Sequence, residues 1–273
     1  SDRAPRQYRA RMDGVRAVLI DIDGVLTVSW KPLPGAVAAI EALRSADLPF
    51  ALVTNTTSRT RARIAETLVD AGFPVGPDDV VGAPAATAAH LRENHPGAAC
   101  LLLSSGDVAD DMDGVRLVGP DAADVDVVVF GGAGPEFSYE ALDAVYRHLQ
   151  HDAALVAMHR NLYWRTDAGL QLDAGAFLLG LEKAADVEAV VLGKPSGAFF
   201  AAALSTLGVG RSEAVMVGDD LEADVLGAQR AGIPAVLVRT GKFTAKDEEG
   251  IDDDRPQHVV DSIADLPGLL GLR

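Results

Sequence analysis

Residues 16–27 read RAVLIDIDGVLT, an apolar run followed by two acids and a glycine. Val18, Leu19 and Ile20 form a short run that is apolar on both faces, as is typical of a buried central strand in a parallel sheet. Two acids, Asp21 and Asp23, follow it directly. Burying a carboxylate is costly unless it has a partner, and ligands bind at the carboxyl ends of strands in open parallel sheets. The stretch therefore predicts a site where a divalent cation and a phosphate accompany the two acids.

The composition limits the classes of function. The chain has 273 residues, which suits two modest domains, and a formal net charge of −16, which argues against general nucleic-acid binding. A phosphate substrate would then need local positive charge from a metal ion, a lysine and helix N-termini. The sequence has no apolar run near the roughly 20 residues that span a bilayer and no apolar leader segment. We therefore expect no membrane partner. Cys100 is the only cysteine, so no internal disulfide can form and we expect a cytoplasmic protein.

Strand and helix patterns alternate along the chain, which indicates a parallel α/β sheet. The predicted core strands are 18–20, 50–53, 214–217 and 235–238, and a helix that carries Ile64, Leu68 and Val69 follows the second of them. The pattern restarts near residue 97, with strands at 99–103, 125–130 and 155–158. We therefore predict a Rossmann-like doubly wound parallel core (1–81 and 192–273) with an inserted α/β cap domain (82–191).

Polar residues stand at or just beyond the ends of four core segments. In chain order they are Asp21 and Asp23; Thr54 and Asn55; Lys194; and Asp219, Asp220 and Asp224. Each group alone has a simpler explanation, because threonines and aspartates also cap helices. Since parallel strands end at one edge of a sheet, we expect the groups to converge although they lie far apart in the sequence.

This combination suits phosphoryl transfer to a carboxylate. Asp21 would attack phosphorus and form an aspartyl-phosphate, while Asp23 would protonate the leaving oxygen and later activate water. Asp219 would supply an oxygen ligand to Mg²⁺. The Thr54 side chain and main-chain amides near Gly24 and Asn55 would hold phosphate oxygens. Lys194 would neutralise the charge that develops during the reaction.

The motifs also carry a family resemblance. Asp21-Ile22-Asp23-Gly24-Val25-Leu26, Thr54-Asn55, Lys194-Pro195 and Gly218-Asp219-Asp220-x-x-x-Asp224 resemble the four motifs of the haloacid dehalogenase-like phosphatases. The insertion between the second and third motifs resembles the subgroup with a large α/β cap, and several shorter blocks agree. These blocks are Asn55-Thr56-Thr57, Phe137-Ser138-Tyr139, Gly193-Lys194-Pro195-Ser196, Gly227-Ala228-Gln229 and Val238-Arg239-Thr240-Gly241-Lys242-Phe243.

The resemblance implies roles for individual residues. Asp21 would be the nucleophile and Asp23 the acid/base. The Asp21 side chain, the Asp23 carbonyl and Asp219 would bind Mg²⁺, and Asp220 and Asp224 would orient the waters on the metal. The substrate would be a small phosphorylated metabolite or pyrophosphate, and two copies of such a chain often pair through their caps.

Residues 159–164, HRNLYW, gather polar and aromatic groups after a predicted cap strand. Loops of this kind commonly face a ligand, so His159 and Asn161 are our candidates for contacting the leaving group. A packing cluster of Tyr163 and Trp164 beside a solvated histidine accounts equally well for the same residues. Residues 131–134, GGAG, lack the third glycine of a dinucleotide-binding loop and predict only a turn.

We therefore predict a Mg²⁺-dependent phosphatase that hydrolyses a small phosphate ester or anhydride through an aspartyl-phosphate. Two alternatives stay open at this point. One is an enzyme that transfers the phosphoryl group to another metabolite, and the other is a non-catalytic, phosphate-binding regulatory module on the same fold.

Overall fold

A computed structural model describes residues 12, 14–166, 169–242, 256 and 258–272. The chain forms two compact units. The first comprises residues 1–54, 62–81 and 200–273, and the second comprises residues 55–61 and 82–199. The second unit thus includes residues 55–61 and 192–199, which lie outside the predicted cap of 82–191; the predicted domain boundaries stay a prediction.

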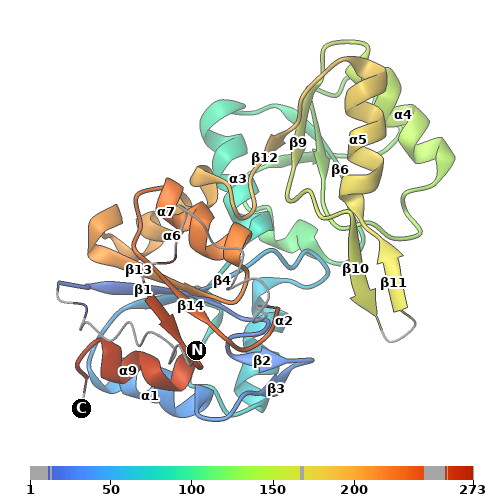
Figure 1. Cartoon of the computed structure of the whole chain (residues 1–273). Coiled ribbons are helices and arrows are strands. Elements are labelled where there is room, and N and C mark those ends of the chain that lie inside the picture. The colour runs from blue at the N-terminus through green and yellow to red at the C-terminus, as the bar shows by residue number, and fades with distance from the viewer. Residues whose placement is uncertain (1–11, 13, 167–168, 243–255, 257, 273) are drawn as a thin grey trace, which may run out of the picture. The chain divides into compact units, whose positions relative to one another are not determined.

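The first unit is built on a six-stranded sheet with the order β15-β14-β13-β1-β4-β5 (Figure 1). Its strands are β1 (Ala17–Asp21), β4 (Phe50–Thr54), β5 (Val80–Gly82), β13 (Ala214–Gly218), β14 (Ala235–Val238) and β15 (His258–Val260). From β1 the chain first adds strands on one side, and it later adds β13, β14 and β15 on the other. The strand order therefore reverses between β1 and β13, and such a switch point is where open α/β sheets bind ligands.

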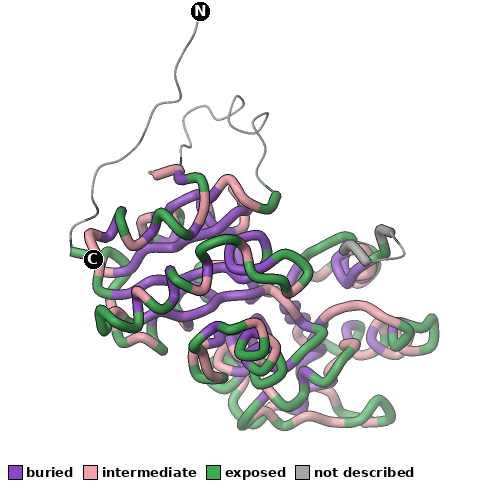
Figure 2. Tube along the Cα trace, turned by 90° about the horizontal axis from the view of Figure 1, so that it is seen from below, coloured by how far each residue is buried: buried purple, intermediate pink, exposed green. Residues whose placement is uncertain are grey.

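Helices cover both faces of this core sheet. Figure 1 shows α1 (Ala36–Ser45) and α9 (Leu266–Leu269) on one face, with α6 (Gly197–Leu207) and α7 (Gly227–Arg230) on the other. Alternation along β1 explains the two layers, because Val18 and Ile20 pack into the cluster that contains Ile40 of α1. The strands are buried along most of their length, as the purple segments of Figure 2 show. Because the strands are buried between the two helix layers, the positions of their carboxyl ends are fixed by the packing of the core.

The first unit has further elements: α2 (Arg61–Asp70), a π-helical turn (Leu221–Leu226), a hairpin of β2 (Thr27–Val28) with β3 (Lys31–Pro32), and 3₁₀ turns at Pro77–Asp79, Arg211–Glu213 and Ile263–Asp265. Helix α2 carries the three large apolar residues that the sequence places in it. Ile64 and Leu68 are buried, whereas Val69 is 51% exposed. One residue beyond Leu68, a side chain is turned by about 100° around the helix axis, away from the core.

The second unit holds a five-stranded parallel sheet with the order β12-β9-β8-β6-β7. Its strands are β6 (Ala99–Leu103), β7 (Arg116–Val118), β8 (Val127–Phe130), β9 (Ala154–Ala157) and β12 (Val190–Val191). Val128 and Phe130 face the layer of α4 (Tyr139–Leu149) and α5 (Ala174–Ala185). Val127 and Val129 face α3 (Ala83–Asn94) and a 3₁₀ turn at Val108–Asp111. The predicted α/β class, with a doubly wound core and an inserted α/β unit, is confirmed.

Several short elements were not predicted from the sequence. A hairpin joins β10 (Tyr163–Thr166) to β11 (Gly169–Leu172), so the expected loop at 159–164 ends in a strand. Strands β7 and β15 are only three residues long, too short for a clear hydrophobic pattern. Among the described residues, no helix combines the length and apolar character that crossing a membrane requires.

Candidate active site

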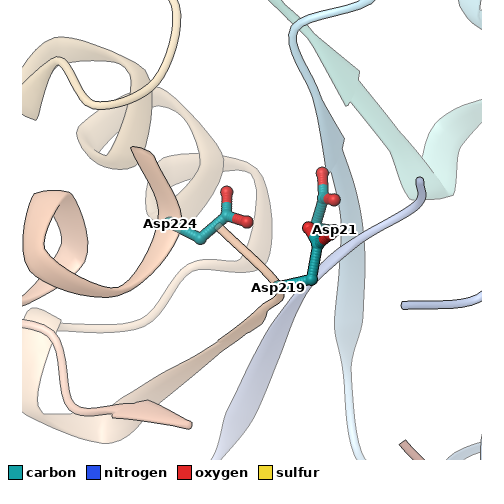
Figure 3. A group of neighbouring side chains, drawn as sticks. All are labelled: Asp21, Asp219 and Asp224. Atoms are coloured by element: carbon teal, nitrogen blue, oxygen red, sulfur yellow. The ribbon is translucent and has the colours of Figure 1, made fainter. Parts of the chain in front are cut away.

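Three carboxylates meet at the switch point of the core sheet. Asp21 ends β1, Asp219 follows β13, and Asp224 lies in the π-helical turn after it (Figure 3). The parallel pairing of Ile20 with Val217 places the ends of β1 and β13 side by side. One oxygen from each carboxylate lies within 4.8 Å of the others, and all three side chains are buried. The sequence thus brings acids almost 200 residues apart into one cluster, as the strand-end argument predicted.

Asp219 is held very tightly. Its Oδ2 atom accepts a 2.7 Å hydrogen bond from the main-chain N–H of Lys242. Gly24 and Gly241 lie against the same oxygen, with φ angles of +83° and +79°. A Cβ atom on these glycines would lie 2.2 and 2.1 Å from Asp219 Oδ2, respectively. Only glycine therefore fits on either side of this carboxylate.

The other oxygen of Asp219 is available for a ligand. Asp219 Oδ1 is buried and accepts no hydrogen bond from any residue that the structure describes. A buried carboxylate oxygen in that state is costly, and a cation would offset the cost. Because hard oxygen donors suit Mg²⁺, the cluster of Asp21, Asp219 and Asp224 fits a divalent metal ion of this kind.

The protonation of Asp219 reflects the same crowding. Burial raises its pKa to about 6, and the neighbouring Asp224 and Asp220 add to the rise, while the Lys242 N–H opposes it. Burial disfavours the charged ammonium of Lys242, but Asp220, Asp219 and Asp21 together raise the pKa of that group. The carboxylates therefore repel one another, and positive charge placed among them would stabilise the site.

Asp220 and Asp224 support the cluster in different ways. Asp220 caps the π-helical turn, because its Oδ1 accepts the N–H groups of Glu222 (3.1 Å) and Ala223 (2.9 Å). Its Oδ2 accepts a hydrogen bond from the Lys242 ammonium at 3.1 Å. Asp224 Oδ2 accepts the main-chain N–H of Asp220 at 3.2 Å. Asp224, expected behind the metal ligands, thus lies in the same group as Asp21 and Asp219, whereas Asp220 faces Lys242 and the start of the helical turn.

The remaining predicted residues of the first unit lie close by in the fold. Thr54 is the buried last residue of β4, which pairs with β1. Asp23 is exposed and begins a tight turn in which the Gly24 N–H donates to the Thr27 carbonyl at 2.7 Å. The Thr240 hydroxyl in turn donates to the Gly24 carbonyl at 2.6 Å. The loop after β1 is thus tied to the loop after β14.

Two predicted residues meet in the second unit. The Asn55 side chain donates to the main-chain carbonyl of Lys194 at 2.9 Å and accepts the main-chain N–H of Lys194 at 2.8 Å. Lys194 is itself buried. Both ends of the Asn55 carboxamide are therefore engaged by one residue that is 139 positions away.

His159 lies inside the second unit. Its side chain is only 2% exposed, which rules out the solvated histidine of the packing alternative. Its Nδ1 accepts the Asn161 N–H at 3.2 Å, and its Nε2 lies 3.3 Å from the Thr57 hydroxyl and 3.8 Å from Asp173 Oδ2. Burial lowers the pKa of His159, although Asp173 opposes this shift. The imidazole is a neutral hydrogen-bonding group in the interior, whereas Asn161 is exposed.

Several partners in these sites were missed from the sequence. The Thr57 hydroxyl lies 3.3 Å from His159 Nε2, and Asp173 caps α5 while also accepting the Ala133 N–H at 3.0 Å. Gly241 and Lys242 were not included in the site. Their signal was present, since they follow β14, whose carboxyl end lies at the same edge as those of β1 and β13.

Comparisons with known proteins agree with this geometry. A haloacid dehalogenase-like hydrolase family model matches residues 18–117, and a HAD-hydrolase-like model matches residues 191–266. Phospholysine phosphohistidine inorganic pyrophosphate phosphatase from Rattus norvegicus is 34% identical over 269 residues, covering 96% of this chain and 97% of the relative. The matches thus cover nearly the whole chain.

Solved structures show the same fold. A 4-nitrophenylphosphatase from Thermotoga maritima superposes with a TM-score of 0.87 at 25% identity, covering 94% of this chain and 98% of that chain. A glycerol phosphate phosphatase from Mycobacterium tuberculosis, solved in complex with magnesium, gives 0.83 at 27% identity, covering 93% and 76%.

The chain belongs to the haloacid dehalogenase-like hydrolases. Within that family it is similar to the phosphatases whose α/β cap is inserted between the second and third motifs, and the predicted enzyme class is confirmed.

Proposed function

We propose that the chain is a Mg²⁺-dependent phosphatase that hydrolyses a small phosphate ester or anhydride through an aspartyl-phosphate at Asp21. The observation that carries the proposal is the buried carboxylate cluster of Asp21, Asp219 and Asp224 at the switch point of a haloacid dehalogenase-like core. Phosphate monoester hydrolysis is extremely slow without a catalyst, so a nucleophile, a proton donor and charge neutralisation are all needed.

In the first step, an oxygen of Asp21 attacks phosphorus, and the bond from phosphorus to the leaving oxygen breaks. Asp23 gives its proton to that oxygen, so the alcohol or phosphate leaves in neutralised form. Asp23 is exposed, and access to solvent suits a group that must exchange protons. In the second step, Asp23 takes a proton from water, the resulting hydroxide attacks phosphorus, and the bond to Asp21 breaks.

The other residues hold the phosphoryl group and its charge. The Thr54 hydroxyl and the main-chain amides of Gly24 and Asn55 would bind its oxygens, and Lys194 would neutralise them. Mg²⁺, held by the Asp21 side chain, the Asp23 carbonyl and Asp219, would supply further positive charge to the phosphoryl oxygens. Asp224 and Asp220 would orient the waters on the metal.

The choice of substrate is proposed only as a class. The names of the similar proteins cover an anhydride, inorganic pyrophosphate, and the esters 4-nitrophenyl phosphate and glycerol phosphate. We propose that the present chain acts on a small compound of the same kinds, with the exposed Asn161 as a contact to the leaving group and His159 as the buried group that holds the Asn161 main chain. Pairing of two chains stays a prediction.

The proposal is tested by following phosphate release from 4-nitrophenyl phosphate, glycerol phosphate and pyrophosphate with Mg²⁺ and no other acceptor. The parent protein should release phosphate and, when quenched in acid, retain labelled phosphate on the protein. Asp21→Asn should do neither. Labelled protein that loses its label only when a second metabolite is added, with the label recovered on that metabolite, would identify a transferase. Binding without any turnover would identify a regulatory module.

A further inference from the structure

The Asn55 side chain and the main chain of Lys194 form a two-point contact. The two hydrogen bonds, at 2.9 and 2.8 Å, run in opposite directions between one carboxamide and one peptide residue. Such paired bonds fix orientation as well as distance, because neither end can rotate without breaking one of them. The side chain of Lys194 takes no part in this contact. Asn55 therefore sets the position of the Lys194 backbone whatever the Lys194 side chain does.

Gly193, next to Lys194, is tightly packed against the Asn55 side chain and the Met158 main chain. A Cβ atom on Gly193 would lie 2.7 Å from Asn55 Oδ1 and 2.2 Å from the Met158 carbonyl oxygen. The peptide before Lys194 therefore rests directly on the Asn55 side chain and on the residue that follows β9. Lys194 has only 7% of its surface exposed, so its own surroundings also restrict it.

The segment that carries Asn55 is itself anchored along its length. Two residues further on, the Thr57 hydroxyl lies 3.3 Å from His159 Nε2. A Cβ atom on Gly106 would lie 2.8 Å from the Ser58 carbonyl oxygen, so these main chains are in close contact. The Arg61 N–H donates to Asp111 Oδ2 at 2.8 Å. Asn55 is thus a fixed point of the second unit and not the tip of a loose loop.

We propose that Asn55 is a positioning residue for Lys194: its carboxamide aims the lysine by holding the lysine main chain, and it does not bind phosphate itself. This inference rests on the proposed function of Lys194 as the group that neutralises the phosphoryl oxygens. It leaves the main-chain N–H of Asn55 available for the phosphate contact predicted from the sequence. The two roles are separable because side-chain substitutions remove only the first.

A double-mutant cycle tests the proposal. Lys194→Ala removes the ammonium but keeps both hydrogen bonds, since Asn55 contacts only the main chain. Asn55→Ala should lower kcat by ten- to a hundredfold, because misplacing a catalytic group by about 1 Å costs about that much. KM should change by less than about threefold. In the Lys194→Ala background, with more enzyme to keep the rate measurable, Asn55→Ala should change kcat by less than about twofold.

Two further variants separate positioning from folding. Asn55→Asp has the same shape and still accepts the Lys194 N–H, but it faces the Lys194 carbonyl with a second acceptor, so it should lose kcat as Asn55→Ala does. Asp111→Ala removes the acceptor of the Arg61 N–H and so loosens the same segment without touching the Asn55 contact. It should lose stability to urea yet keep kcat within about threefold of the parent.

The results that overturn the inference are distinct from those that overturn the proposed function. Positioning through Lys194 would be overturned by an equal loss of kcat on Asn55→Ala in both backgrounds, or by a loss in Asp111→Ala as large as in Asn55→Ala. It would also be overturned if inorganic phosphate inhibited Asn55→Ala/Lys194→Ala more weakly than Lys194→Ala. So would an unchanged kcat in Asn55→Ala. If the parent protein released no phosphate at all, the proposed function would fail first, and this inference with it.

Discussion

Replacing Gly241 by alanine should disable the metal site without unfolding the protein. The new Cβ atom would lie 2.1 Å from Asp219 Oδ2, whereas real Cβ contacts essentially never fall below 3.0 Å. The carboxylate would have to move by 0.9 Å or more. It cannot move freely, because Gly24 lies on its other side and its Oδ2 accepts the Lys242 N–H at 2.7 Å. The substitution therefore displaces Asp219 or opens the loop after β14.

The expected magnitude follows from the demands of the ion. Mg²⁺ requires oxygen ligands at about 2.0–2.1 Å in nearly ideal octahedral geometry, so a displacement of this size removes Asp219 from the ligand set. We expect the Mg²⁺ concentration for half-maximal hydrolysis of 4-nitrophenyl phosphate to rise more than about tenfold. At a fixed Mg²⁺ concentration of about 100 times the parent Kd, a tenfold weaker Kd lowers the stabilisation by Mg²⁺ from about 2.7 to about 1.4 kcal/mol.

Gly232→Ala is the matched control. Gly232 has a φ of +81°, almost the same as the +79° of Gly241. A Cβ atom on Gly232, however, would have Arg211 Cδ as its nearest neighbour at 3.7 Å, an ordinary contact. Both variants should lose about 1–2 kcal/mol of unfolding free energy in urea without Mg²⁺, because both place alanine in the left-handed region. Only Gly241→Ala should also lose Mg²⁺ affinity. Equal Mg²⁺ dependence of rate and stability in the two variants would refute the reasoning.

Three further predictions concern the acids. Asp21→Asn should lower phosphate release by at least about a thousandfold, since it removes the nucleophile; a rate within about tenfold of the parent would exclude that role. Asp23→Asn should cost about a hundredfold or more with glycerol phosphate but much less with 4-nitrophenyl phosphate, whose leaving group needs no proton, and equal losses would contradict the acid role. Because burial raises the pKa of Asp219 from 3.8 to about 6, the metal-free fold binds an extra proton between these values. Its unfolding free energy should therefore fall by up to about 3 kcal/mol from pH 4 to pH 7, and saturating Mg²⁺ should remove the loss in urea titrations; a flat or rising profile without Mg²⁺ would contradict this.

The part of the site that the sequence predicted follows from one rule. Asp21, Thr54 and Asp219 could be grouped because each ends or follows a short apolar strand, and parallel strands end at one edge. The same rule extends to Gly241 and Lys242 after β14, but a glycine and an exposed lysine carry little signal of their own. Their importance lies in main-chain contacts to Asp219, and hydrogen bonds from a main-chain N–H leave no trace in residue type.

The burial of His159 in the second unit could not be predicted from the pattern of polar and apolar residues. His159 follows a strand in a polar stretch, and the same letters fit a solvated or a buried ring. Its environment depends on Thr57, which is 102 residues away, and on Asp173 at the start of α5. The hairpin of β10 and β11 was missed because its sequence lacks the Asn-Gly or Asp-Gly pair that marks two-residue hairpins. Contacts between distant segments, and not local propensity, decide these features.

A proton and a divalent cation compete for the carboxylate cluster, and this competition links the stability of the fold to the proposed catalysis. A proton and a divalent cation both relieve the repulsion among Asp21, Asp219 and Asp224, but they leave the nucleophile in different states. The proton neutralises one carboxylate, whereas a cation lets all three stay charged, including Asp21, the nucleophile of the proposed mechanism. The Lys242 ammonium donates to Asp220 at 3.1 Å and also interacts with Asp219 and Asp21, so it offsets part of the negative charge of the cluster. Burial is the largest cause of the raised pKa of Asp219, and Asp224 and Asp220 add to it, so a cation among the three carboxylates would favour their charged forms.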